Sequence, residues 1–102
     1  MGLTKTDQFT SKQNALASIT KALAHPARIA ILQHLLSIEA CITKDLVEQL
    51  PLAQPTISQH LKELKKVGLI RGVVDGTSVN YCIDEKQWKL AKQELNHLFD
   101  EF

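Results

Sequence analysis

The stretch LAQPTISQHLKELKKVGLI, residues 52–70, contains the signals for both ends of one helix. Pro55 fits the first turn of a helix, where an N–H group would lack a partner, and Gly68 fits the position just after a helix end. Between them, apolar side chains recur at steps of three and four, which places them on one side of a helix. These apolar positions are Ile57, Leu61, Leu64 and Val67. We therefore predict an amphipathic helix over residues 54–67 whose apolar side packs against the rest of the protein.

Two helices are predicted at the start of the chain. The first covers about residues 10–24, because Thr10 and Gln13 have the spacing of a capping box. The second begins at Pro26 and is apolar over more than half of its circumference, which predicts a central place in the core. Its apolar residues are Ile29, Ile31, Leu32, Leu35 and Leu36.

A short third helix precedes residues 54–67. The segment KDLVEQL, residues 44–50, is amphipathic, Thr43 can cap it, and Pro51 ends it. Residues 37–41 before it predict a turn with a short extended segment. A short helix, a tight turn and a second helix form the helix-turn-helix arrangement.

A β-hairpin and a last helix complete the chain. Two β-prone runs within residues 69–83 flank Asp75-Gly76-Thr77-Ser78, and an Asp-Gly pair is a strong hairpin signal. Apolar residues then recur at steps of three and four over residues 84–101. The predicted order is α-α-α-α-β-β-α: a mainly α chain with a small β-hairpin (α+β), forming one winged helix-turn-helix domain over residues 1–102. The alternative is a small α+β domain of another purpose.

The bulk composition excludes several classes of protein. The chain has 102 residues, 44% of them hydrophobic and 23% charged, which fits one globular domain. It has no apolar run long enough to cross a membrane, and its first residues lack the apolar segment of a signal peptide. Its two cysteines, Cys41 and Cys82, lack the spacing of metal ligands. We expect a cytoplasmic protein with reduced thiols and no membrane partner.

The outward side of helix 54–67 has the composition of a DNA-reading surface. Amide and hydroxyl groups lie toward its N-terminal end, where base edges are reached, and lysines follow where phosphates lie. The net charge of the chain is only +1, but basic residues gather on this helix and the wing, beside the single acid Glu63. Lysines alone do not distinguish a DNA-binding surface from an ordinary solvent-exposed helix face, because outer helix faces are usually charged. The predicted contacts to double-stranded DNA are Gln54, Thr56, Ser58, Gln59, Lys62, Lys66 and Arg71.

His60 has two interpretations. It is either a groove contact or a side chain on the flank of the helix, tied to the edge of the core. Its position near Ile57 and Leu61 favours the second.

The first and last helices carry apolar stripes that exceed what a small monomer easily covers. Pairing these helices across a two-fold axis would bury both stripes and place two recognition helices side by side. The alternative is that both helices simply cover the core of a monomer. The predicted homodimer interface consists of Leu16, Ile19, Leu23, Trp88, Ala91, Leu95, Leu98 and Phe102.

Two stretches, ALAHPARIAILQHL and DLVEQLPLAQPTISQHLKELKKVGLI, together with the Asp-Gly wing, resemble the ArsR/SmtB-type bacterial transcriptional regulators. The resemblance runs from about Leu16 to Ile83. It implies a homodimeric winged helix that binds operator DNA, usually as a repressor released by an inducer, whose identity here is unknown. It also implies that His60 joins the groove contacts, against the interpretation from spacing, and it leaves Arg28 with either a structural or a phosphate-binding role.

The metal sites of that family are largely lost in this sequence. The family's thiolate site needs a Cys-x-Cys just before an Asp-Leu, and here Cys41 is the only thiol near that position. At the family's second site, Lys86 replaces one ligand, and only Asp84, His97 and Asp100 remain as a residual set. We predict no metal and no other cofactor. Redox sensing by the two cysteines is a minor alternative.

Two other classes of function compete with DNA binding. A winged-helix protein-interaction module would use the same basic face for an acidic partner, but such a partner needs lysines and not amides and hydroxyls. An enzyme would need a nucleophile with a base and an orienting group, or a phosphate-binding loop, and the sequence shows neither. We therefore predict that the chain is not an enzyme.

Overall fold

The computed structural model describes residues 8–38, 41–43, 51 and 53–102. The elements in chain order are α1 (Ser11–Leu23), α2 (Pro26–Ile38), β1 (Ile42–Thr43), α4 (Gln54–Lys66), β2 (Ile70–Asp75), β3 (Ser78–Ile83) and α5 (Glu85–Asp100). The winged helix-turn-helix prediction is confirmed for the α1, α2, α4, hairpin and α5 elements. The predicted third helix, residues 44–50, lies outside the described residues, and Thr43, its predicted cap, lies in β1.

Side chains cap the first and last helices. Thr10 and Gln13 form the predicted capping box, with the Gln13 N–H donating to Thr10 Oγ1 (3.0 Å) and the Thr10 N–H to Gln13 Oε1 (2.9 Å). Asp84 caps α5 by accepting from the Gln87 N–H at 3.1 Å. Pro26 opens α2 as predicted.

The C-terminal end of α4 turns directly into the wing. Gly68 has φ +82°, the left-handed conformation that glycine tolerates best. The Gly68 N–H donates to the Lys65 carbonyl at 3.0 Å and the Leu69 N–H to the Leu64 carbonyl at 3.2 Å. This pair of bonds is a Schellman motif, and it confirms Gly68 as the predicted helix stop.

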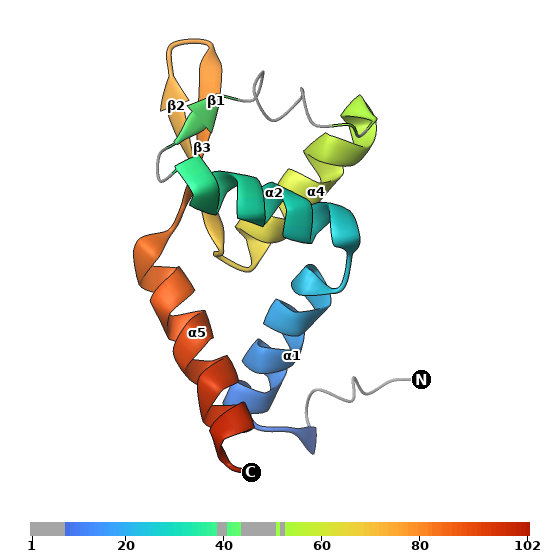
Figure 1. Cartoon of the computed structure of the whole chain (residues 1–102), viewed down its shortest axis with the longest axis vertical. Helices are drawn as coiled ribbons and strands as arrows, with labels where there is room; N and C mark the ends of the chain where they lie inside the picture. The colour runs from blue at the N-terminus through green and yellow to red at the C-terminus, as the bar shows by residue number, and fades with distance from the viewer. Residues whose placement is uncertain (1–7, 39–40, 44–50, 52) are drawn as a thin grey trace.

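The sheet has three antiparallel strands in the order β1-β3-β2 (Figure 1). The predicted hairpin is confirmed: Asp75 pairs with Ser78, and Gly76 between them has φ +63°. The third strand, β1, was expected only as a short extended segment before Thr43. Instead it pairs with β3, with Ile42 opposite Tyr81.

The core lies between α2, α4 and the start of β2. Its buried residues are Ile31, Leu32, Leu35, Ile57, Leu61, Leu64, Leu69, Ile70 and Ala91. The prediction for α2 holds only in part, because Ile29 and Leu36 are 37% and 42% exposed. In the part of the chain that the structure describes, no helix has the length and apolar character needed to cross a membrane.

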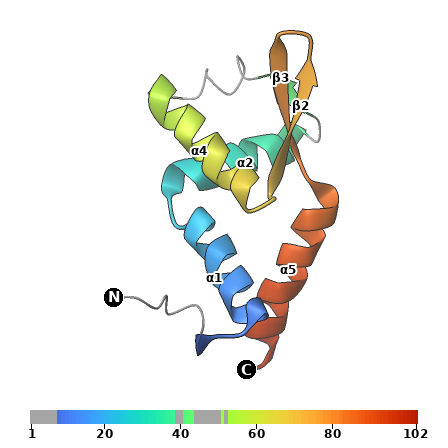
Figure 2. The ribbon, with the colours of Figure 1, turned by 180° about the vertical axis from the view of Figure 1, so that it is seen from behind.

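The helices divide the molecule into two ends. The hairpin tip and the N-terminal end of α4 lie at one end, in both views of the ribbon (Figures 1 and 2). The helices α1 and α5 extend from the central pair α2 and α4 toward the opposite end of the molecule. There the start of α1 lies beside the end of α5.

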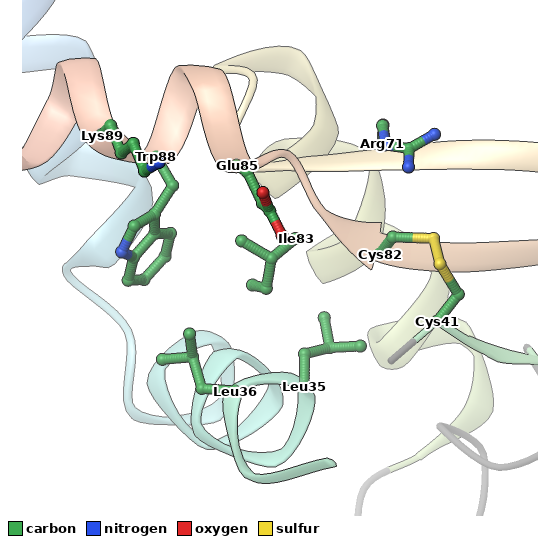
Figure 3. Close-up of a pocket in the computed structure, with 9 residues that line it drawn as sticks. All are labelled: Leu35, Leu36, Cys41, Arg71, Cys82, Ile83, Glu85, Trp88 and Lys89. Atoms are coloured by element: carbon green, nitrogen blue, oxygen red, sulfur yellow. A yellow bond between two sulfur atoms is a disulfide. The ribbon is translucent and has the colours of Figure 1, made fainter. Parts of the chain in front are cut away.

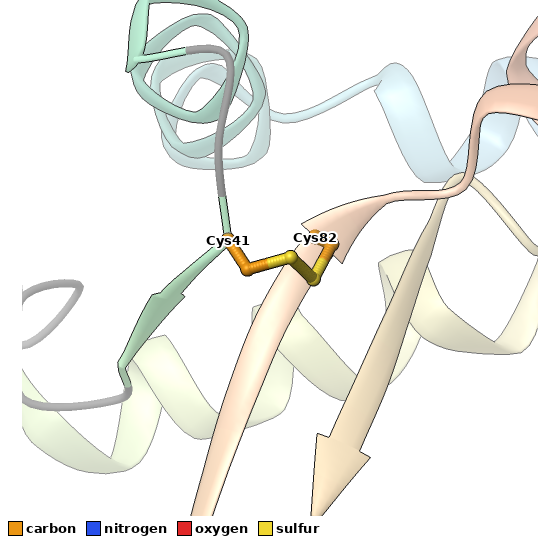
Figure 4. Close-up of a disulfide and its surroundings, with 2 residues drawn as sticks. All are labelled: Cys41 and Cys82. Carbon is orange, nitrogen blue, oxygen red and sulfur yellow. A yellow bond between two sulfur atoms is a disulfide. The ribbon is translucent and has the colours of Figure 1, made fainter.

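Cys41, the residue before β1, forms a disulfide with Cys82 of β3 (Figure 4), so the prediction of reduced thiols is wrong. The register explains the bond. Because Ile42 lies opposite Tyr81, the next antiparallel step places Cys41 opposite Cys82, with their Cα atoms 4.3 Å apart.

Candidate nucleic-acid interface

One side of α4 is buried and the other carries the predicted DNA contacts. Ile57 and Leu64 are fully buried and Leu61 is nearly so, as their helical spacing predicted. Gln54 is the first residue of α4. The exposed predicted residues of this helix are Thr56, Ser58, Gln59, Lys62 and Lys66. The fold therefore presents hydroxyl and amide groups first along this face and ammonium groups after them.

Gln59 is already oriented by a neighbour on its own helix. Its Nε2 donates to Glu63 Oε1 at 3.0 Å, one helical turn further on. The bond uses one of the two amide hydrogens and leaves the Gln59 carbonyl oxygen and the second hydrogen available. Glu63, the one acid of this face, thus holds the amide in place.

Two basic side chains, Lys65 and Arg71, lie where α4 is followed by the wing. Arg71 is exposed near the start of β2. Lys65 reaches from the last turn of α4 over Gly72, so closely that a Cβ added to Gly72 would lie 3.5 Å from Lys65 Nζ. Because consecutive residues of a strand point to opposite faces of the sheet, Lys65 covers the face at Gly72, whereas Arg71 lies on the other face, opposite Cys82.

His60 is not part of the exposed face, and its predicted groove contact is wrong. Only 4% of the residue is exposed, and its Nδ1 accepts a hydrogen bond from Arg28 Nε at 3.1 Å. The interpretation of His60 as a side chain tied to the edge of the core is confirmed. The two residues lie 32 positions apart, so no local pattern in the sequence could show this bond.

Arg28 has a structural role between α1, α2 and α4. Besides binding His60, its Nη1 donates to the Ala22 carbonyl at 3.3 Å. The His25 ring lies 4.4 Å from the His60 ring, and His25 Nδ1 accepts from the Ala27 N–H. Burial, the nearby His25 and the Arg28 guanidinium all lower the pKa of His60, burial most strongly. The imidazole is therefore held neutral, with Nδ1 as its acceptor.

The predicted dimer interface is divided between the core and the surface. Ala91 is only 6% exposed within its own chain, so its assignment to the interface is wrong. Ile19, Leu23 and Trp88 are partly buried against the core of the same chain, and Leu16 and Leu95 are also partly buried. Leu98 and Phe102 are exposed, as an interface requires.

Other apolar residues that the helical spacing missed are also exposed near this end of the molecule. Phe99, on α5, is 70% exposed. Phe9 precedes α1, and Leu90 lies further up α5, each about half exposed. A search for all exposed apolar residues on a helix, and not only for the stripe at steps of three and four, would have found Phe99 and Leu90.

The residual metal ligands do not form a site within one chain. Asp84 caps the start of α5, whereas His97 lies near its end, with its Nε2 atom 3.7 Å from Glu101 Oε1. At a rise of about 1.5 Å per residue, the length of the helix separates Asp84 from His97 by roughly 20 Å. Across the described residues no three His, Cys, Asp or Glu side chains gather as metal ligands would. Within one chain, Asp84 and His97 therefore cannot coordinate the same ion.

The fold and the exposed face of α4 define a winged helix-turn-helix protein. A helix-turn-helix domain model matches residues 23–73. The HTH-type transcriptional repressor SmtB of Mycobacterium tuberculosis is 38% identical over 85 residues, which are 83% of this chain and 57% of the repressor. The chain therefore spans little more than half the length of that relative.

Solved structures of transcriptional regulators are also similar to this chain. The ArsR-like transcriptional regulator from Rhodococcus sp. RHA1 matches with a TM-score of 0.75 and 26% identity, over 90% of this chain and 86% of that one. The transcriptional repressor BigR from Xylella fastidiosa matches with a TM-score of 0.62 and 26% identity, over 95% and 97% of the two chains. The chain belongs to the ArsR/SmtB family of winged helix-turn-helix transcriptional regulators.

Proposed function

We propose that this chain is a sequence-specific DNA-binding repressor that acts as a homodimer on a palindromic operator. One observation carries the proposal: the side of α4 opposite the core exposes Thr56, Ser58 and Gln59 and then Lys62 and Lys66. Amides and hydroxyls distinguish base edges, whereas lysines bind phosphates without regard to sequence. A surface for an acidic protein would need only the lysines.

The surroundings of α4 support a contact with duplex DNA. The N-cap residue is Ala53, whose side chain makes no capping bond, so backbone N–H groups of the first turn remain for a phosphate. Lys65, exposed in the last turn of α4, adds a positive charge to those of Lys62 and Lys66. The hairpin tip lies at the same end of the molecule as the start of α4 (Figure 2).

The dimer is supported by the apolar surface at the other end. Leu98, Phe99 and Phe102 expose about half or more of their area near the end of α5, where the start of α1 lies beside it. Apolar residues gathered in this way on a small protein mark an interface. A two-fold axis through this end would leave both copies of α4 free to reach successive major grooves, about 34 Å apart.

The test is a selection of genomic DNA fragments with the purified protein, followed by affinity measurements on the recovered sequences. Recovery of an inverted repeat with half-sites about one helical turn apart is expected. Weak binding that depends only on salt, with no sequence recovered, would overturn the proposal. The basic face would then belong to a protein-interaction module, and acidic protein partners would be tested in place of DNA.

A further inference from the structure

A cavity of about 780 Å³ lies on the far side of α2 from the recognition face, between α2, the sheet and the start of α5 (Figure 3). Its volume is within the range of small-molecule sites, about 300–1,000 Å³. The apolar part of its wall consists of Leu35, Leu36, Ile83 and Trp88. Charged side chains from two elements complete it: Arg71 from β2, and Glu85 and Lys89 from α5.

The Cys41–Cys82 disulfide is part of the same wall (Figure 3). Its two residues differ in exposure: Cys41 is exposed, whereas Cys82 is only 4% exposed. A thiolate must approach the sulfur that it attacks, so the exposed residue, Cys41, is the more accessible target for a molecule in the cavity. Cys82 is then the leaving group.

The register of the sheet places a positive charge beside that leaving group. Arg71 lies opposite Cys82 in the β2–β3 pair. Cys41 lies opposite Cys82 on the other edge of β3, one step after the Ile42–Tyr81 pair. Directly opposed residues of antiparallel strands point to the same face of the sheet, with Cβ atoms about 5 Å apart. A guanidinium in this row stabilises a thiolate on Cys82, which makes it a better leaving group.

The charges of the cavity favour an anion. Arg71 and Lys89 contribute two positive charges, against the single carboxylate of Glu85. Cavities with walls of low dielectric concentrate ligands of the opposite charge. Trp88 and the leucines accommodate an aliphatic part, so the charges select the ligand by its carboxylate.

We propose that this cavity is a binding and exchange site for a small carboxylate-bearing thiol, which reduces the Cys41–Cys82 disulfide. The ligand loses its proton to water and its thiolate attacks Cys41 Sγ. A new S–S bond forms between ligand and Cys41, and the bond to Cys82 breaks, leaving a thiolate that takes a proton from water. A second ligand thiolate attacks the mixed disulfide, so two ligand molecules supply two electrons and leave as their own disulfide.

The choice of a cellular thiol as ligand rests on the proposed DNA-binding function. A regulator works where the DNA is, and in that compartment small thiols keep most cysteines reduced. Disulfides found there are usually transient and report the redox state. The exchange chemistry itself does not depend on DNA, so it is tested without DNA.

The experiment measures how fast three small thiols reduce the oxidised full chain: 3-mercaptopropionate (anionic), 2-mercaptoethanol (neutral) and cysteamine (cationic). The protein is first treated with diamide, and each rate is divided by the rate of the same thiol with a neutral model disulfide. After this correction the anionic thiol is expected to exceed the cationic one by on the order of tenfold. Acid quenching, alkylation and peptide mass analysis should place the mixed disulfide on Cys41.

Charge-reversal variants separate the cavity from the total charge of the protein. Lys89→Glu should abolish the preference for the anionic thiol, whereas Lys12→Glu, which makes the same charge change on α1, should keep it. Three results would each overturn the proposal: no intramolecular disulfide after diamide, a mixed disulfide on Cys82, or equal corrected rates for the three thiols. Loss of DNA binding would overturn the proposed function and leave these rates unchanged, so the two failures are distinguishable.

Discussion

Replacement of Lys66 by alanine should weaken binding to every DNA sequence and reduce the dependence of affinity on salt. If Lys62, Lys65 and Lys66 each neutralise one phosphate, a dimer makes at least six such contacts. The slope of log affinity against log salt is then about −5, at roughly 0.9 per phosphate. A dimer of Lys66→Ala loses two contacts, so its slope should become less steep by about 1.8.

The matched change on the same helix is Gln59→Ala, which removes an amide and no charge. Its salt slope should equal that of the wild type, while discrimination between the operator and a variant at the contacted base falls by about 1–3 kcal/mol per site. Fluorescence anisotropy titrations at four or five salt concentrations, on operator and on unrelated duplex, give both quantities. Lys86→Ala, on α5 away from this face, controls for the change in total charge. An unchanged slope for Lys66→Ala, or a flattened one for Gln59→Ala, would refute this division of roles.

Three further predictions concern stability and assembly. The pKa of His60 is lower in the folded protein than in the unfolded chain. The free energy of unfolding should therefore decrease as the pH falls below about 6.5, toward the folded pKa. Urea titrations across pH should show this loss in the wild type and in the control His97→Gln, and less of it in His60→Gln. Phe99→Glu should convert the dimer to a monomer in sedimentation equilibrium, whereas Val74→Glu, an equally polar change on the exposed wing, should leave the mass unchanged. Gly68→Ala should lower the free energy of unfolding by about 1–2 kcal/mol, because its φ is in the left-handed region.

Local signals in the sequence predicted the ends of the helices and the hairpin turn. The Thr10 and Gln13 capping box, Pro26, Gly68 and the Asp-Gly turn act through bonds or backbone preferences within four residues of themselves. Their effect therefore does not depend on the rest of the fold. The exposed and buried sides of α4 were predictable for the same reason, because helical spacing is a local property.

The pairing of β1 with β3 was not predictable in the same way. A strand of two residues, Ile42–Thr43, carries no alternating pattern, and its partner lies far along the chain. Without that pairing, nothing places Cys41 beside Cys82. The disulfide is a consequence of the register of the sheet. Spacing along the sequence alone therefore predicted that Cys41 and Cys82 are two free, reduced thiols.

His60 shows why the helical position of a residue does not settle its role. The spacing indicated the flank of α4, and the resemblance to the family indicated the groove. The inward position of the His60 ring is explained by Arg28, which lies on another helix and donates a hydrogen bond to Nδ1. A polar side chain at the boundary of a helix face is more easily buried when another element supplies a hydrogen-bond partner.

The recognition helix and the wing form one rigid unit, which limits how the disulfide can affect DNA binding. The Schellman bonds at Gly68 and the buried side chains of Leu64, Leu69 and Ile70 join α4 to β2 within the core. Reduction of Cys41–Cys82 breaks no contact in that connection, because the disulfide lies on the other side of β3, where β1 pairs. A change of DNA affinity on reduction would therefore come from a movement of β1. Substitutions in the α4–β2 connection should then change the affinities of the oxidised and the reduced protein by the same factor.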